Sequence, residues 1–456
     1  MGDTIAAIAT GTAVSAIGII RMSGDDAITI ADKVFKAHGG TKLSGAKDRQ
    51  MYYGELICSD GNLIDLVLCM ISRGPNSYTG ENTAEFQCHG SPLVLSEVLK
   101  TLFSHGARQA LQGEFTKRAF LNGRLDLVQA EAVIDLIESE TLSAAQNAAG
   151  QLRGAVGIKL EAVYASLVDV IAHFHAVIDY PDEDIDTFEM QGYLSSLQSA
   201  KVELERLLST HERGRIMLHG VPTAIIGRPN TGKSSLLNAI LGYDRAIVTD
   251  IPGTTRDTIE ERVLFGGVLL RLIDTAGLRQ TDDVVEKLGV ERTRLALDDA
   301  KLVILVLDGS EPLRDEDYEA IDSIPKNIPK ISVINKSDLQ AKIDIETLKQ
   351  SELDCLSISA KTGDGLSELD ERIKAFFPEL GMAATGEIIT NSRQFDAITR
   401  AGDCIMAAIS SMESSMTPDA VVVDIEAALA SIGEVTGKTM REDIISRIFE
   451  RFCVGK

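Results

Sequence analysis

The stretch "GRPNTGKSS" at residues 227–235 decides the fold class of this 456-residue chain. It has the form GxxxxGKS, follows the apolar run "VPTAII" and precedes the helix-like "SLLNAIL". In such a loop, glycines let main-chain N–H groups surround the α- and β-phosphates of a nucleotide. Lys233 reaches the β- and γ-phosphates, and the Ser234 hydroxyl binds Mg²⁺ at a helix N-terminus. Because a glycine-rich turn without a ligand has the same composition, the neighbouring motifs must decide.

Two further motifs each follow an apolar, strand-like run. "DTAG" at 274–277 follows "LLRLI" and places Asp274 where a Walker-B carboxylate holds Mg²⁺. "NKSD" at 335–338 follows "KISVI". The amide of Asn335 and the carboxylate of Asp338 match the O6 and N1/N2 edge of guanine.

The remaining motifs complete a GTP site. "SAK" at 359–361 follows "CLSI" and supports the base. "TDIPGTTRD" at 249–257 suits a switch loop in which Thr255 closes on Mg²⁺ and the γ-phosphate. Their order predicts a GTP-binding G domain with a Ras-like P-loop α/β fold. The predicted GTP contacts are Asn230, Thr231, Gly232, Lys233, Ser234, Ser235, Thr249, Asp250, Ile251, Pro252, Gly253, Thr254, Thr255, Asp274, Thr275, Ala276, Gly277, Asn335, Lys336, Asp338, Ser359, Ala360 and Lys361, with Mg²⁺ on Ser234 and Thr255.

The residue after DTAG is Leu278, whose side chain neither donates nor accepts a hydrogen bond. Small regulatory GTPases often carry a glutamine near this position to orient the attacking water. Hydrolysis therefore needs another water-positioning group and another positive charge. Asp282, Asp283 and Glu286 follow, and we expect two of these three acids to be ordinary solvated surface. The side-chain carbonyl of Asn230 could help to bind a monovalent cation beside the phosphates.

The amino-acid composition bears on which partners the protein can bind and on where in the cell it lies. The net charge of −23 argues against a chain that grips nucleic acid alone, because phosphate contacts need Lys and Arg. A local basic patch or a second protein would have to supply much of the grip on RNA. Six scattered cysteines without CxxC spacing suit the cytoplasm. We expect the uncharged residues 4–20 to form a strand and loop rather than a signal peptide, and no other segment looks able to span a bilayer.

Proline, glycine and the apolar periodicity divide the chain into four regions. Residues 1–118 alternate short β-like runs with turns, which predicts α+β structure, and residues 119–215 are helical in pattern. Residues 216–380 alternate strands and helices, and residues 381–456 return to helices. The simplest interpretation is a helical domain interrupted by an inserted α/β domain. Apolar steps of three and four predict one long helix over residues 125–152.

The whole chain, from Asp3 to Lys456, resembles the MnmE (also called TrmE) family of tRNA-modification GTPases. Besides the G-domain motifs and the terminal "FCVGK", four stretches carry the resemblance: "PNSYTGENTAEFQCHG" (75–90), "GEFTKRAFLNGRLDLVQAEAV" (113–133), "DYPDEDID" (179–186) and "VEKLGVERT" (285–293). One departure is "TGTAVSAIGIIR", where the family usually has a loop rich in proline and glycine.

The resemblance implies a homodimer built by the N-terminal domains, with a 5-formyl- or 5,10-methylene-tetrahydrofolate pocket between them. It implies G domains that pair with K⁺ bound and only then hydrolyse GTP. With the FAD-dependent partner MnmG, in a heterotetramer or larger complex, such a protein places an aminomethyl or carboxymethylaminomethyl group on C5 of the wobble uridine of tRNA. By position, the implied roles are water orientation by Glu286, K⁺ binding by Asn230, Thr249, Ile251 and Thr254, and folate binding by Arg21, Glu85, Arg124 and Lys456.

Three alternatives stay open at the level of sequence. Cys453 either takes part in chemistry beside the folate pocket or is a small buried thiol in a packed chain end. A ribosome-associated switch GTPase of the Era or Der kind would carry a basic KH-like domain after the G domain, whereas the sequence here is helical. An ATP-using kinase or assembly protein is disfavoured by "NKSD", whose carboxylate does not match the edge of adenine.

Overall fold

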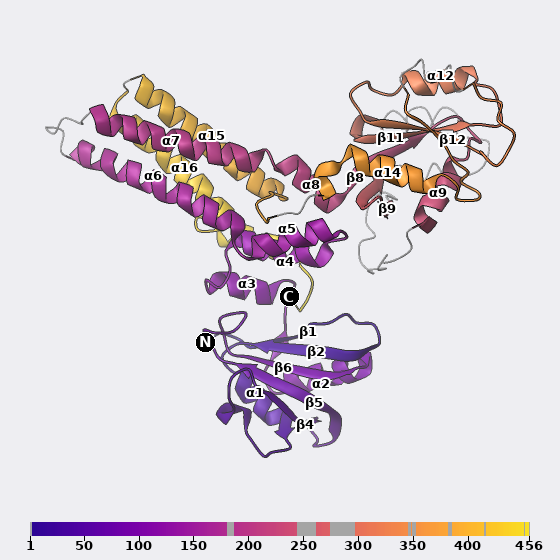
Figure 1. Ribbon diagram of the computed structural model, residues 1–456. Coiled ribbons are helices and arrows are strands. Elements are labelled where there is room, and N and C mark those ends of the chain that lie inside the picture. Colours follow the sequence, from indigo (N-terminus) through magenta and orange to yellow (C-terminus); the bar gives the residue numbers. More distant parts are fainter. Residues whose placement is uncertain are drawn as a thin grey trace. The chain divides into compact units, whose positions relative to one another are not determined.

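The computed structural model describes residues 2–179, 187–243, 261–273, 297–344, 348, 353–381, 385–414, 416–450 and 452–455 (Figure 1). The chain divides into two compact units. The first unit comprises residues 1–134, 151–203 and 396–456, and the second comprises residues 135–150 and 204–395. The predicted fold class, an α+β module and a helical domain interrupted by a P-loop α/β domain, is confirmed.

The first unit begins with a seven-stranded sheet in the order β3-β4-β5-β6-β2-β1-β7. Neighbouring strands pair antiparallel, except that β1 and β7 run parallel. Its strands are β1 Ile5–Ile8, β2 Ser15–Ser23, β3 Phe35–Ala37, β4 Met51–Ile57, β5 Leu63–Ser72, β6 Thr83–Gly90 and β7 Arg108–Gln109. The predicted strand and loop over residues 4–20 correspond to β1 and the start of β2.

The two faces of this sheet differ because side chains alternate along each strand. One face, with Met22, Cys69 and Phe86, packs in an apolar cluster with helices α1 (Ala27–Val34) and α2 (Pro92–Ser104). The short 3₁₀ helix η1 (Leu43–Gly45) lies beside α1. The opposite face, called the open face below, carries two of the residues predicted to bind folate, Arg21 and Glu85.

Helices make up the rest of the first unit (Figure 1). They include α3 (Glu114–Leu121), α6 (Ala155–Asp179), α16 (Pro418–Thr436) and α17 (Glu442–Phe449). Helix α6 lies alongside α16, and α3 packs against α17. Two further helices, α7 (Thr187–Leu208) and α15 (Ser392–Glu413), each begin in one unit and end in the other.

The single long helix predicted over residues 125–152 is wrong. The structure has two helices there, α4 (Leu127–Glu138) and α5 (Leu142–Leu152). The Oγ1 atom of Thr141 accepts a hydrogen bond from the main-chain N–H of Ala144 at 3.1 Å. Threonine in this position caps a new helix start, which competes with continuation of the first helix.

The second unit contains a six-stranded sheet in the order β13-β12-β11-β8-β10-β9. All pairs are parallel except β9 with β10. The strands are β8 Val221–Ile226, β9 Glu261–Phe265, β10 Val268–Leu272, β11 Leu302–Asp308, β12 Lys330–Asn335 and β13 Cys355–Ser357. The helices are α8 His211–His219, α9 Lys233–Tyr243, α12 Asp315–Asp322 and α14 Leu366–Phe376, with the 3₁₀ helix η2 at Pro378–Gly381.

The parallel strands explain the continuous apolar runs in the sequence. Every residue of β8 and of β11 is buried, as expected for strands covered on both faces. The loops that follow β8, β11, β12 and β13 therefore emerge at the same edge of the sheet. Among the described residues, no helix has the length and apolar character needed to cross a membrane.

Candidate functional site

The P-loop lies between β8 and α9, at the carboxyl edge of the parallel sheet. Helix α9 begins at Lys233, so Lys233, Ser234 and Ser235 form its first turn, where unpaired N–H groups attract anions. Gly232 has a φ of +96°, and a Cβ atom there would lie 2.2 Å from Nδ2 of Asn335. Only glycine allows this close approach between the P-loop and the NKSD motif.

The ammonium of Lys233 is held inside the loop by the loop's own backbone. Its Nζ donates to the carbonyl oxygens of Gly227, at 2.7 Å, and Arg228, at 2.9 Å. Burial, together with the nearby positive charge of Arg228, lowers the pKa of Lys233. The loop thus already concentrates positive charge where phosphate oxygens are expected.

The structure brings the NKSD motif against the P-loop and the SAK motif against the NKSD motif. Buried Asn335 donates from Nδ2 to the carbonyl oxygen of Thr231 at 2.9 Å, and its Oδ1 accepts from the N–H of Ala360 at 3.0 Å. An amide group has two N–H donors and two acceptor lone pairs, so Asn335 keeps capacity for a base. The hydroxyl of Ser359 donates to Oδ1 of Asp338 at 2.8 Å, which orients that carboxylate, and Lys361 is exposed in the next turn.

A lysine–aspartate pair ties the same motif to the loop. Nζ of Lys336 lies 2.6 Å from Oδ2 of Asp308 and donates to the carbonyl oxygen of Asn230 at 3.0 Å. Although burial acts in the opposite direction, the bonds from Lys336 and Ser310 lower the pKa of Asp308. Asn230 has a φ of +64° and is exposed, so its side chain is accessible to an ion at the loop.

Many predicted site residues lie outside the described residues. They are Thr249, Asp250, Ile251, Pro252, Gly253, Thr254, Thr255, Asp274, Thr275, Ala276, Gly277, Glu286 and Lys456, as well as Leu278. Their roles stay predictions.

A second polar site lies on the open face of the N-terminal sheet. Arg21 on β2 faces Glu85 on β6, with Nε 2.6 Å from Oε1. The guanidinium carbon lies 5.6 Å from the ring centroid of Tyr78 and 5.8 Å from that of Phe115. Within the described part of the chain, Nη1 and Nη2 of Arg21 make no hydrogen bond, so this edge can bind an anion.

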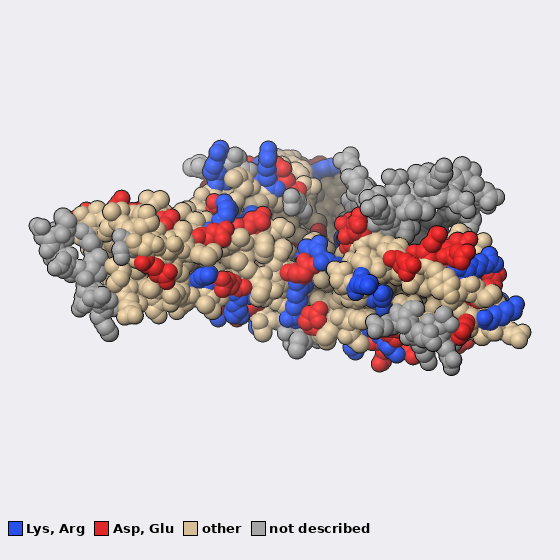
Figure 2. All heavy atoms as spheres, turned by 90° about the horizontal axis from the view of Figure 1, so that it is seen from above, with Lys and Arg blue, Asp and Glu red and all other residues tan. Residues whose placement is uncertain are grey.

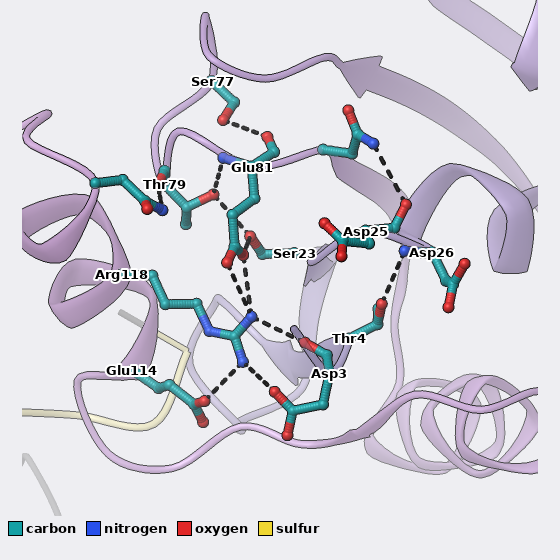
Figure 3. Close-up of polar contacts among 12 residues, drawn as sticks. Asp3, Thr4, Ser23, Asp25, Asp26, Ser77, Thr79, Glu81, Glu114 and Arg118 are labelled. Carbon is teal, nitrogen blue, oxygen red and sulfur yellow. Dashed lines mark hydrogen bonds and ion pairs between the residues drawn. The ribbon is translucent and has the colours of Figure 1, made fainter. Parts of the chain in front are cut away.

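A network centred on Arg118 supports this site (Figure 3). Its Nη1 lies 3.0 Å from Oε2 of Glu81, and its Nη2 lies 2.9 Å from Oε1 of Glu114 and 2.8 Å from Oδ1 of Asp3. Ser23 donates to Glu81 at 2.7 Å. Because three carboxylates surround it, the Arg118 guanidinium holds loop 77–82 against α3 rather than offering a free positive charge.

The predicted folate residue Arg124 is exposed beyond α3, and a Cβ atom on Gly80 would lie 3.3 Å from its Cγ. The same loop therefore reaches both Arg124 and, through Tyr78, Arg21. A ligand with a carboxylate and an N–H edge fits a guanidinium beside a carboxylate. These residues fit a folate chemically.

Residues 453–455, near the C-terminus, pack against the N-terminal part of the chain. Val454 forms a bridge with Gln112, and the N–H of Gly113 donates to the carbonyl oxygen of Cys453 at 3.3 Å. A Cβ atom on Gly455 would lie 2.2 Å from the carbonyl oxygen of Ile8, so the tail packs closely on the end of β1. Cys453 itself is exposed, which contradicts the alternative of a buried thiol.

Sequence reasoning missed several residues of both sites. In the G domain these are Arg228, whose guanidinium packs on α12, and Asp308. An acid that ends an apolar strand was an available signal for Asp308, because such strand ends face the ligand in parallel sheets. Tyr78 and Phe115 gave no comparable signal in the sequence.

Comparisons with known proteins identify the family of this chain. Residues 4–124 match the GTP-binding protein TrmE N-terminus, and residues 127–453 match the MnmE helical domain. The tRNA modification GTPase MnmE of Thermoanaerobacter pseudethanolicus is 44% identical over 460 residues, which cover 100% of this chain and 99% of that one. The chain belongs to the MnmE family.

Other MnmE relatives are similarly close. Those of Clostridioides difficile and Symbiobacterium thermophilum are each 42% identical over 100% of this chain and 99% of their own length. A solved structure of Aquifex aeolicus Era bound to GDP·AlF4⁻ is 27% identical and covers 41% of this chain and 66% of that one, with a TM-score of 0.27. As a member of the MnmE family, the protein is a GTPase.

Proposed function

We propose that the protein is a K⁺-stimulated GTP hydrolase that acts with MnmG to modify C5 of the wobble uridine of tRNA, using a one-carbon tetrahydrofolate. The observation that supports it best is the meeting of the P-loop, NKSD and SAK motifs at one sheet edge. Ser234 at the start of α9 and Thr255 would hold Mg²⁺, which supplies charge stabilisation at the phosphates.

Because Leu278 stands where many GTPases have a catalytic glutamine, we propose that K⁺ and Glu286 replace its function. Asn230, with Thr249, Ile251 and Thr254, would hold K⁺, and Glu286 would orient the attacking water. The exposed side chain of Asn230 beside Lys336 is consistent with this proposal.

GTP turnover in KCl and in NaCl tests the role of the cation. We expect faster hydrolysis in KCl, and equal rates would contradict the proposal. Glu286→Ala should lower the rate by about two orders of magnitude or more while GTP binding is retained, as for other groups that position a nucleophile. Full activity of this variant would reassign the role.

We propose that the N-terminal site binds the folate. Arg21 and Arg124 would pair with the anionic groups of the ligand, and Glu85 would accept from the N–H edge of the pterin. Lys456 and Cys453 would complete the site, and the return of residues 453–455 to the end of β1 supports this assignment. Calorimetry with 5-formyltetrahydrofolate tests it, and unchanged affinity in Arg21→Met would contradict it.

A homodimer is the proposed assembly, and the open face of the N-terminal sheet supports it. Five large apolar side chains are exposed there, on β2, β4 and β5: Ile17, Met51, Tyr53, Leu66 and Leu68. Apolar side chains gathered on one sheet face are characteristic of interfaces. Arg21 and Glu85 share this face, so a second copy docked on it would border the folate site.

The remaining proposals concern partners, location and domains. On the face shown in Figure 2, Lys and Arg side chains are interspersed with Asp and Glu. Together with the net charge of −23, this favours shared tRNA binding with MnmG rather than binding by this chain alone. All six cysteines are free, which supports a cytoplasmic protein. The proposed domains are residues 1–118 for folate binding and dimerisation, 216–380 for GTP hydrolysis, and 119–215 with 381–456 for the helical domain.

A further inference from the structure

The side chain of the second P-loop residue, Arg228, is directed away from the phosphate cradle and is only 8% exposed. Its Nε lies 3.1 Å from Oδ2 of Asp317, and its Nη2 lies 2.7 Å from Oε2 of Glu311. Asp317 is in the first turn of α12, and its side chain is 3% exposed. The phosphate chemistry of a P-loop needs main-chain N–H groups and a lysine and does not account for this buried ion pair.

Asp317 also caps the N-terminus of α12. The same oxygen, Oδ2, accepts the N–H of Arg314 at 3.0 Å and so caps the helix start. Its other oxygen, Oδ1, is buried and makes no hydrogen bond with any described residue. Since both bonds end on one oxygen, loss of Arg228 would leave a buried carboxylate with a single donor.

The backbone of Arg228 links this pair to catalysis. Its carbonyl oxygen accepts from Nζ of Lys233 at 2.9 Å and from Oγ1 of Thr231 at 3.0 Å. The second half of the loop is held separately, by Asn335 at Thr231 and by Lys336 at Asn230. Movement of Arg228 would therefore displace Lys233 while the other end of the loop stays in place.

We propose that Arg228 and Asp317 are positioning residues for the GTPase reaction: α12 holds the guanidinium so that the Arg228 carbonyl sets the place of the Lys233 ammonium. Glu311 assists from the half-exposed side and also pairs with Arg314, at 2.8 Å. Asp317 and Glu311 also partly offset the charge of Arg228.

The test is the dissociation rate of a fluorescent GDP analogue from the full-length protein, measured by stopped flow. Arg228→Met should release the analogue about tenfold faster, the scale of one lost hydrogen-bonded contact that orders a binding loop. On a logarithmic scale, the increase in dissociation rate should be about half as large in Arg228→Lys, because an ammonium can pair with one carboxylate but cannot bond to two as a guanidinium does. Asp317→Asn should also accelerate release, although an amide still caps α12.

Charge and position are separated by the double variant Arg228→Met with Asp317→Asn, which has the same net charge as the parent. Positioning predicts that release stays fast in the double variant, whereas a return to the parental rate would overturn the inference. Arg372→Met removes an ion pair to Asp354, at 2.7 Å, elsewhere in the same unit and is the matched control. It should leave release within about twofold of the parent.

A purely structural role would lower the melting temperature without changing nucleotide release, and that outcome would also overturn the inference. If Arg228→Met does not fold, the dissociation rates of the analogue from Asp317→Asn and Glu311→Gln decide whether the pair positions the loop. The inference depends on nucleotide binding at the P-loop. A parent protein that fails to bind the analogue would refute the proposed function, whereas unchanged release in the variants refutes only the positioning pair.

Discussion

At the residue scale, nucleotide choice rests on a few side chains that converge from separate loops. Asp338 follows β12 and Ser359 follows β13, and their hydrogen bond of 2.8 Å fixes the direction of the carboxylate. A carboxylate accepts from the two N–H groups of guanine, whereas adenine presents an acceptor at the matching position. This geometry would let the carboxylate of Asp338 select guanine over adenine.

Asp338→Asn should weaken GTP binding by about 10- to 100-fold, since an amide N–H would face a guanine N–H and leave a donor unpaired. Xanthosine triphosphate, which carries a carbonyl at C2, should bind this variant better than GTP does. Equilibrium titrations with both nucleotides measure the change. Asp364→Asn is the matched control, because Asp364 is exposed nearby and bonds to Thr362 at 2.7 Å. Equal GTP affinity in the two variants would contradict this role.

At the element scale, α3 connects the first residues of the chain to the proposed folate site. Glu114, in its first turn, is buried and accepts from both Arg108 and Arg118, while Phe115 packs on β1. An acid at a helix N-terminus is also stabilised by the helix dipole. Although burial raises it, the bonds from Arg108, Leu111 and Arg118 leave the pKa of Glu114 below its ordinary value of 4.5.

Acid should destabilise this element in a defined pH window. The pKa of Glu114 is lower in the folded state, as is that of Asp3, which bonds to Arg108. The stabilisation is therefore present above the unfolded values, 4.5 and 3.8, and is lost as pH falls through the folded ones. As pH falls below 4.5, the melting temperature should decrease less steeply in Glu114→Gln than in the parent protein. The exposed Glu97 provides the control Glu97→Gln, and identical slopes in all three proteins would contradict the assignment.

At the scale of the whole molecule, the open face of the N-terminal sheet is the proposed dimer interface. Leu66 and Leu68 are each 39% exposed on β5, and Ile17 on β2 is 56% exposed. Arg21 lies on the same face, so assembly and cofactor binding would use one surface. Exposed leucines stabilise a dimer through the apolar area that a second copy would cover.

Leu68→Glu should dissociate the proposed dimer, because a charge would have to be buried without a partner. Sedimentation velocity of the full-length protein measures the mass. Leu93→Glu makes the same change on α2, at a position 82% exposed, and should leave the dimer intact. A dimer that survives Leu68→Glu would place the interface elsewhere.

The motifs, their order and most strands and helices could be predicted from the sequence, because apolar periodicity reports directly which positions are buried. The break at residues 139–141 was missed, since the capping bond of Thr141 gives no apolar signal. Pairs such as Arg228 with Asp317, Lys336 with Asp308 and Arg118 with Glu81 were decided by the tertiary structure alone. Charged side chains far apart in the chain meet only where strand order places them, and periodicity carries no information about which partner each one meets.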